Sequence, residues 1–507
     1  MSPTETNLLS TCVGVNFQLK IFHEKPILAA FLSGLLIAVA QSPCHLDFLI
    51  WPSLIPLIST FRIRTNWATT ANIAATFGLT YIWTTHLWIT TASITAWILI
   101  GTLAIFPAAS VIISRFFYQL YPKNPLTPAI LTAITFSTIE LIRTSLAPLG
   151  VAPLAIAISP LTLLQNAKWG GQWALTFLLV FVAATIEHLL QLRSNKSETK
   201  SLYSPAATLA TILAFYTGYG YLSISEKPKT DNSLTVNILS TNYKTDPSPE
   251  NRWNQILWLL NNSVGFKADL TIWPEFLTDD PLSNQNLLDT IREKWNQEPG
   301  AFSLSTTHHE SDKKFNATIL FENQATEVQI ARKHILATYW EVRPAWAISG
   351  NNRSYTPGPP NTPFLTSKNR IAVITCIEEL APHTIQNQLK WHPQFIISAS
   401  SNEFTTLWGS HQQTQSARIR AIEYGLPILR ASNCGFSTIF DSKGQTLLFT
   451  NQTGPNIRTL HYESNPSQTI IGKYNQNTVA IVLTLLASSI LFAFESFRFA
   501  VSKQNQQ

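Results

Sequence analysis

Long apolar runs separated by short polar loops dominate the first 224 residues of the chain. Runs such as ILAAFLSGLLIAVA (27–40) and GGQWALTFLLVFVAATIEHLL (170–190) approach the roughly 20 residues that a helix needs to cross a bilayer. A mixed polar stretch follows, and TVAIVLTLLASSILFAF (478–494) then supplies one more apolar run. The pattern predicts about eight membrane spans, at 26–41, 46–60, 67–88, 91–113, 127–147, 170–191, 205–224 and 478–494.

Residues 225–477 show a different pattern, in which short β-branched runs alternate with helical stretches. This alternation is typical of an α/β domain whose sheets are covered by helices. The chain therefore divides into a polytopic α-helical membrane domain (1–224), an inserted α/β domain (225–477), and a final span with its tail (478–507). The predicted strands are 234–240, 269–275, 301–307, 316–322, 370–376, 395–400, 426–432 and 436–441, and the predicted helices are 250–264, 283–295, 378–389 and 410–424.

Composition supports a membrane protein, since 45% of the residues are hydrophobic and 13% are charged. The four cysteines form no CxxC or Cys/His pair at metal-ligand spacing, so we expect no disulfide framework, metal site or cofactor. The formal net charge of +6 is modest, and much of the basic excess lies at membrane edges. We therefore expect no nucleic-acid partner.

Basic loop residues predict which side of the membrane the α/β domain faces, because short cytoplasmic loops accumulate Lys and Arg. Arg62, Arg115, Arg193 and Arg498 mark the ends of the second, fourth, sixth and eighth predicted spans. The alternate loops carry almost no basic residues, with Lys168 as the exception. Both termini are then cytoplasmic, and the α/β domain lies outside.

Two predicted strands end in candidate catalytic residues, and chemistry in α/β folds gathers at the carboxyl ends of strands. LTIWPE ends in Glu275, RIAVITC ends in Cys376, and Lys333 lies between them in sequence. A carboxylate can take a thiol proton, an ammonium can stabilise a thiolate and an oxyanion, and the thiolate can attack an acyl carbonyl. Each signal is weak by itself, because a cysteine that ends a buried strand is more often a small core residue.

Longer motifs around these residues resemble those of the apolipoprotein N-acyltransferase family, membrane enzymes whose outer domain belongs to the nitrilase superfamily. LTIWPE is similar to the family's strand that ends in the catalytic Glu, and KHILATYWE matches the segment from the catalytic Lys to a second essential Glu, here Glu341. CIEE matches the Cys-Tyr-Glu nucleophile motif and adds Glu378. The block SARIRAIEYGLPILRASNCGFSTIFDSKG (416–444) and the membrane segment IELIR (139–143) also have family counterparts.

The resemblance implies an αββα sandwich for the outer domain and a ping-pong acyl transfer. Cys376 would take a fatty acyl chain from a phospholipid as a thioester, and the α-amino group of a diacylglyceryl-cysteine lipoprotein would accept it. Glu275 is implied as general base and acid, and Lys333 with the backbone N–H of Ile377 as the oxyanion hole. The implied location is the bacterial inner membrane, with the catalytic domain facing the periplasm.

Some positions near the triad depart from the family pattern or leave alternatives open. Ile377 stands where the family usually has Tyr, and Ile335 where it usually has His. These substitutions bear on substrate positioning, because neither replaces a triad member. Glu341 and Glu378 either hold Lys333 charged and in place or form structural ion pairs.

Arg332 competes with Lys333 for the role of catalytic cation, because an alignment on His334 would put Arg332 in that place. The gapless spacing from Lys333 to Glu341 favours Lys333. A compact ammonium also approaches a thiolate and an oxyanion more easily than a planar guanidinium does.

Two rival functions belong to other classes. A membrane-tethered nitrilase-type amidase would pass the acyl group to water, although a hydrolase of small soluble amides does not need so large an apolar half. A non-catalytic membrane scaffold could keep the fold, although the intact Glu, Lys and Cys argue against it.

Four further positions receive structural interpretations. Glu140 and Arg143 lie three residues apart on one predicted span, so we expect them to pair with each other rather than to bind a lipid headgroup. Trp88 is interpreted as an anchor at the membrane interface. Cys434 is interpreted as a packing residue.

Overall fold

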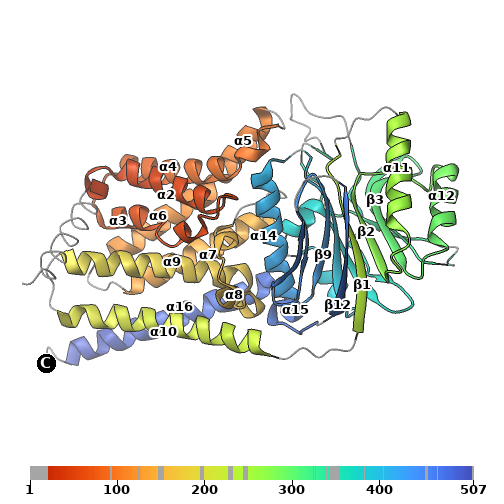
Figure 1. The fold of residues 1–507 in the computed structure, drawn as a ribbon. Coiled ribbons are helices and arrows are strands. Elements are labelled where there is room, and N and C mark those ends of the chain that lie inside the picture. The colour runs from red at the N-terminus through yellow and green to blue at the C-terminus, as the bar shows by residue number, and fades with distance from the viewer. Residues whose placement is uncertain are drawn as a thin grey trace, which may run out of the picture.

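The chain folds into a bundle of long helices and an α/β domain, as a computed structural model shows (Figure 1). Parts of the predicted spans 91–113 and 127–147 lie outside the described residues. The structure describes residues 21–504 apart from 92–93, 123–125, 147–152, 195–198, 227–231, 244–248, 324, 326, 339, 343–353, 382, 404, 451–454 and 465.

The long helices of the bundle lie side by side, and α16 from the far end of the chain packs against α7 and α9 (Figure 1). Three helical segments among the described residues are long and apolar enough to cross a membrane: Trp97–Leu120, Leu126–Ser145 and Ala167–Ser194. Pro26–Ala40 and Gln476–Ser489 are apolar but shorter. The helices are α2 (Pro26–Ala40), α4 (Trp67–Thr85), η3 (Leu87–Thr91), α5 (Ile94–Leu103), α6 (Ile105–Leu120), α7 (Leu126–Leu146), η4 (Leu154–Ala157), α8 (Leu161–Leu164), α9 (Ala167–Ser194), α10 (Thr199–Ser225) and α16 (Gln476–Gln504).

The predicted second span, 46–60, does not form one helix. It folds as the 3₁₀ turn η1 (Asp47–Ile50), the helix α3 (Ile55–Ser59) and the 3₁₀ turn η2 (Thr60–Arg62). Pro52 lies between the first two pieces, and proline has no backbone N–H to continue a helix. Because a five-residue helix is only about 7 Å long, this segment does not cross a bilayer as a single helix.

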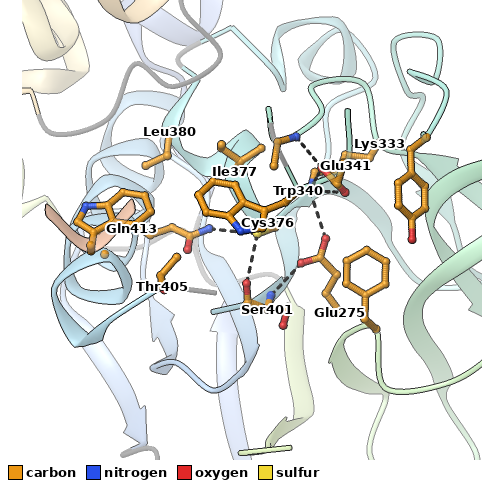
Figure 2. A pocket seen from close by; sticks show the side chains of 15 residues that line it. Glu275, Lys333, Trp340, Glu341, Cys376, Ile377, Leu380, Ser401, Thr405 and Gln413 are labelled. Carbon is orange, nitrogen blue, oxygen red and sulfur yellow. Dashed lines mark hydrogen bonds and ion pairs between the residues drawn. The ribbon is translucent and has the colours of Figure 1, made fainter. Parts of the chain in front are cut away.

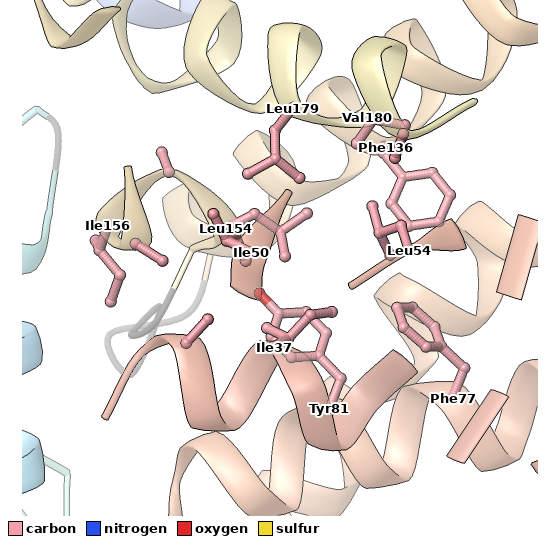
Figure 3. Close-up of a cluster of buried hydrophobic side chains, with 14 of the residues drawn as sticks. Ile37, Ile50, Leu54, Phe77, Tyr81, Phe136, Leu154, Ile156, Leu179 and Val180 are labelled. Carbon is pink, nitrogen blue, oxygen red and sulfur yellow. The ribbon is translucent and has the colours of Figure 1, made fainter. Parts of the chain in front are cut away.

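A large apolar core holds the bundle together (Figure 3). Phe77 from α4, Phe136 from α7 and Leu179 from α9 belong to it. The rings of Phe77 and Phe136 meet edge to face, with centroids 6.2 Å apart. Side chains from helices that are distant in sequence therefore pack against one another around this core.

The predicted Glu140–Arg143 pair is confirmed, with 3.8 Å between Arg143 Nη2 and Glu140 Oε1. Both side chains are buried. Glu140 also accepts hydrogen bonds from the Thr176 hydroxyl at 2.6 Å, the Leu154 backbone N–H at 2.9 Å and the Tyr81 hydroxyl at 3.2 Å. These contacts link α4, α7 and α9 through one carboxylate, which compensates for burying its charge.

The α/β domain, residues 225–477, is called the outer domain from here on. Its described strands form two six-stranded sheets, in the orders β12-β1-β2-β3-β4-β5 and β11-β10-β9-β8-β7-β6. Parallel pairs occupy the centre of each sheet, and antiparallel pairs flank them. Each predicted strand is present, whereas β5, β6, β11 and β12 were not predicted because they are short or lack a buried apolar run. The strands are β1 (Asn232–Ser240), β2 (Leu270–Glu275), β3 (Ala301–Glu310), β4 (Lys313–Phe321), β5 (Gln329–Arg332), β6 (Phe364–Leu365), β7 (Arg370–Thr375), β8 (Phe395–Ser401), β9 (Ile428–Asn433), β10 (Ser437–Phe440), β11 (Thr446–Thr450) and β12 (Asn456–Ser464).

The two sheets stack face to face and are covered by helices on both outer faces (Figure 1). Ile272 from the first sheet and Val373 from the second share the apolar core between them. Helices α11 (Pro249–Ser263) and α12 (Gln285–Trp295) cover the first sheet, and α14 (Leu407–Tyr424) with α15 (Ile470–Tyr474) covers the second. The outer domain therefore has the predicted αββα layers.

The predicted helix 378–389 is instead two short pieces, η5 (Cys376–Leu380) and α13 (Gln386–Leu389). Pro382 falls between them in the sequence, and a proline disfavours helical geometry at the residue before it.

Helix α14 joins the outer domain to the helix bundle. Gln412 on this helix donates to the Thr85 carbonyl at 3.0 Å and accepts from the Trp88 indole at 2.8 Å. Near its end, Glu423 accepts from the backbone N–H of Gln172 in α9 at 2.9 Å. The same helix that covers the second sheet is thus bonded to α4, η3 and α9.

We predict that Gly409→Ala weakens this junction. A Cβ at Gly409 would lie 2.6 Å from the Trp88 ring, which the bond to Gln412 holds in place. Such overpacking costs about 1–3 kcal/mol, so the midpoint of thermal unfolding in detergent should fall. Gly218→Ala in α10 is the control, because its added Cβ meets nothing within 4 Å. The control should keep or raise the midpoint, and equal behaviour of the two variants would contradict the predicted role of Gly409.

Candidate active site

The three predicted catalytic residues come together at the strand ends. Glu275 is the last residue of β2, Lys333 directly follows β5, and Cys376 directly follows β7. Cys376 lies between Gln413 and a cluster formed by Glu275, Lys333 and Glu341 (Figure 2). The chain thus brings residues about 100 positions apart in sequence into one site.

Lys333 is buried between two carboxylates. Its Nζ lies 3.2 Å from Glu275 Oε1 and 2.9 Å from Glu341 Oε2, and 1% of the residue is exposed. Burial lowers the pKa of this ammonium, but the charges of Glu275 and Glu341 outweigh burial and raise the pKa well above its usual value. Lys333 is therefore a fixed cation.

Glu275 has its remaining oxygen positions occupied by hydrogen-bond donors. Asn316 Nδ2 donates to Oε1 at 2.6 Å, and the Ser401 backbone N–H donates to Oε2 at 2.8 Å. Burial raises the pKa of Glu275 above its ordinary value, although Lys333 opposes that shift. A carboxylate with a raised pKa is better suited to accept and return a proton.

Cys376 lies at the start of η5 with a positive φ of 52°, a conformation that non-glycine residues rarely adopt. Its Sγ donates to the Ser401 carbonyl at 3.7 Å. Burial and the charge of Glu275 raise the pKa of the thiol to about 12, with Lys333 opposing them. The thiol is therefore protonated at neutral pH, and it needs a base at the moment of attack.

Gln413 is a site residue that the sequence analysis missed. Its Nε2 donates to Cys376 Sγ at 3.7 Å, and its Oε1 accepts from Asn402 Nδ2 at 2.6 Å. Asn402 Oδ1 in turn accepts from Arg430 at 3.1 Å. Because the amide oxygen is occupied, the amide nitrogen is directed at the sulfur.

A buried ion pair anchors this chain of contacts. Arg430 Nε lies 2.9 Å from Glu379 Oε1, and both side chains are fully buried. Glu379 belongs to the CIEE motif and Arg430 to PILRAS, about 50 residues later in the sequence. Neither motif predicted this contact.

Glu341 and Glu378, which the sequence left with two possible roles, act differently. Glu341 pairs directly with Lys333, and it also accepts from the Ala337 backbone N–H at 2.6 Å. Glu378 instead accepts from the backbone N–H groups of His334 and Ile335, at 2.8 and 3.1 Å.

Glu378 also accepts from the Thr375 backbone N–H at 2.8 Å, as part of a capping box. Glu378 thus ties the loop that carries Lys333 to the end of β7, directly before Cys376. Burial raises the pKa of Glu378.

Arg332 points away from the site and pairs with the half-exposed Glu310.

Asn316, within the FNATILF strand, binds both Glu275 and Glu341. The sequence motif contained this residue but indicated no role for it. Cys434 donates to the Tyr243 carbonyl at 3.3 Å and does not line the catalytic cavity, in line with a packing role.

A mostly apolar cavity of about 700 Å³ opens over Cys376. Trp88, expected at the membrane interface, is instead 5% exposed and reaches this cavity from the helix bundle. Among the described residues, no group of three His, Cys, Asp or Glu side chains is arranged to hold a metal ion. The apolar lining is formed by Trp88, Phe276, Trp340, Tyr355, Ile377 and Leu380.

Comparisons with known proteins cover both halves of the chain. Residues 33–185 match the apolipoprotein N-acyltransferase N-terminal domain, and residues 236–470 match the carbon-nitrogen hydrolase domain. An apolipoprotein N-acyltransferase of Haemophilus ducreyi is 24% identical over 356 residues, which are 66% of this chain and 68% of that protein. One of Sinorhizobium fredii is 22% identical over 470 residues, covering 82% of this chain and 85% of that protein. The membrane half and the outer domain therefore both resemble the corresponding parts of apolipoprotein N-acyltransferases.

Proposed function

We propose that this chain transfers a fatty acyl chain from a phospholipid, through a thioester on Cys376, to the α-amino group of a diacylglyceryl-cysteine lipoprotein. The supporting observation is the Cys376 thiol beside a buried carboxylate–ammonium cluster, in an apolar cavity that includes Trp88 of the helix bundle. A cavity shared by a catalytic domain and a membrane bundle suits two substrates that are both anchored by lipid chains.

In the proposed first half-reaction, Glu275 takes the thiol proton as Sγ attacks the ester carbonyl of the phospholipid. The ammonium of Lys333 and the backbone N–H of Ile377 stabilise the oxyanion. The ester C–O bond then breaks, and the lysophospholipid alkoxide leaves with the proton held by Glu275. The acyl group remains on Cys376 as a thioester.

In the second half-reaction, the lipoprotein amine attacks the thioester carbonyl. Glu275 accepts a proton from the amine nitrogen, and the same oxyanion donors act again. The C–S bond breaks, and Glu275 returns the proton to Sγ. Gln413 positions the sulfur in both halves, because its amide nitrogen donates to Sγ.

We also propose the finer membrane arrangement. The chain crosses the bacterial inner membrane about eight times, with residues 1–224 and 478–507 as the membrane part and residues 225–477 in the periplasm. The segment at 46–60 would then cross as consecutive short helical pieces packed against α2 and α9 rather than as one helix. The basic loops support the orientation.

The thioester is the first testable consequence. After incubation with phospholipid micelles, mass spectrometry of the intact protein should show an added acyl chain that hydroxylamine removes. Cys376→Ser should show no such adduct, because a hydroxyl without a tuned base is a poor nucleophile. Cys434→Ser is the matched control and should still be acylated. An adduct that persists in Cys376→Ser would refute the assignment, and release of the acyl group to water despite an available lipopeptide would favour the amidase.

The choice of cation is the second consequence. Lys333→Ala should slow acyl-enzyme formation about 100-fold or more, the usual cost of an oxyanion donor. Arg332→Ala should lose little, because its partner Glu310 is at the surface. Single-turnover acylation rates of the two variants test this. Similar losses in both, or a larger loss in Arg332→Ala, would contradict the role given to Lys333.

Orientation is the third consequence. A reporter enzyme that works only outside the cytoplasm should be active when fused after Ser225 and inactive when fused at residue 196. The reverse pattern would place the outer domain in the cytoplasm, where it could not meet exported lipoproteins.

A further inference from the structure

A polar cavity lies at the boundary between the helix bundle and the outer domain. It has a volume of about 850 Å³ and is formed by the start of α9, the end of α10 and loops of the outer domain. Helices α8, α10 and α15 come together in this region of Figure 1. None of its described lining residues belongs to the catalytic cavity. The lining includes Lys168, Tyr219, Ser223, Glu226, Lys443 and Ser467.

Lys168 is the residue that departs from the charge pattern of the loops, and the fold buries it. It is 6% exposed and lines this cavity. In the described part of the chain, Lys168 Nζ has neither an ion pair nor a hydrogen bond. The charges of Glu226, Asp441 and Lys443 act on it without a paired contact. The ammonium thus lies at the cavity without a protein partner, and an anion bound there would form a charge-assisted hydrogen bond with it.

Two other groups favour the same kind of ligand. The Ser467 hydroxyl is buried and lacks a hydrogen-bond partner among the described residues. Lys443 brings a second ammonium to the cavity, where it donates to the Ile224 carbonyl at 2.7 Å. Two cations and one carboxylate, Glu226, therefore line the cavity. A phosphate group, with several acceptor oxygens and a negative charge, matches these donors.

One face of α10 leads from this cavity into the membrane part. Phe215, Tyr219 and Leu222 are spaced four and three residues apart, so they lie on the same face of the helix. Tyr219 lines the cavity, whereas Phe215 is 57% and Leu222 is 71% exposed. Ile470, at the cavity itself, is 49% exposed. Exposed apolar side chains beside a polar cavity suit an amphiphile better than a free anion.

We propose that this cavity binds the phosphate group of a phospholipid, with Lys168 and Ser467 contacting its oxygens and an acyl chain lying along Phe215. This lipid is distinct from the acyl donor in the catalytic cavity. It would fill the boundary where the outer domain rests on the helix bundle.

The test uses the full chain carrying Cys376→Ala, so that no acyl transfer can consume the lipid. The midpoint of thermal unfolding is measured in nonionic detergent at increasing concentrations of one ligand. The three ligands are dihexanoylphosphatidylglycerol, the uncharged dihexanoylglycerol and inorganic phosphate. The phospholipid should raise the midpoint. Lys168→Gln should raise its apparent Kd about tenfold or more, the usual effect of losing a charged hydrogen bond. Lys390→Gln, which removes an exposed lysine of the outer domain, should leave the Kd unchanged.

Ser467→Ala should weaken binding less than Lys168→Gln, and it tests the same cavity if Lys168→Gln does not fold. An unchanged Kd in the folded variant would overturn the proposal. If dihexanoylglycerol raised the midpoint as much as the phospholipid does, the cavity would not recognise the phosphate charge, and the proposal would be overturned. A full shift with inorganic phosphate would show a free-anion site and overturn the lipid assignment.

Discussion

Burial of the Lys333 ammonium is the constraint on which the rest of the site depends. With 1% of the residue exposed, this charge has lost its water and needs compensation from the protein. Glu275 and Glu341 supply it, and each needs donors of its own from Asn316, the Ser401 backbone and the Ala337 backbone. These donors come from both sheets and from the loop after β5, so a shift of one sheet against the other would remove the Ser401 N–H from the buried carboxylate of Glu275. The stacking of the two sheets therefore contributes directly to the geometry of the site.

In the proposed mechanism, the charges of this cluster also bear on how a thiol with a pKa of about 12 would react. Creating a new thiolate there would add a third negative charge beside Glu275 and Glu341. Transfer of the proton from Cys376 to Glu275 instead moves a negative charge from one buried atom to another, with Lys333 close to both. The net charge of the cluster is unchanged, so little additional desolvation is needed. This account requires Glu275 and Cys376 to act together.

Helix α14 connects the chemistry to the membrane part. Gln413 directs its amide at Sγ, while the neighbouring Gln412 bonds to Trp88 and to the Thr85 carbonyl. Trp88 completes the apolar cavity from the bundle side. The part of the cavity wall formed by Trp88 is thus present only when the outer domain is docked on the bundle, and a shift of α14 would alter the sulfur's surroundings and this wall together.

The sequence by itself determined the apolar half, the α/β alternation, and the placing of Glu275 and Cys376 at strand ends, because each leaves a local signal in hydrophobic period or motif spacing. It also favoured Lys333 over Arg332 through the gapless distance to Glu341, and the structure buries Lys333 beside Glu341 and turns the partly exposed Arg332 toward Glu310. Contacts between distant segments leave no such signal. Four features depend on how the layers stack and where the helices dock. They are the pairing of Glu379 with Arg430, the orientation of Gln413, the position of Trp88 in the cavity wall and the burial of Lys168. The break in 46–60 has a local cause in Pro52, which the hydrophobic pattern alone does not reveal. The different roles of Glu341 and Glu378 were decided by tertiary structure, because their hydrogen-bond partners come from other elements or from the backbone.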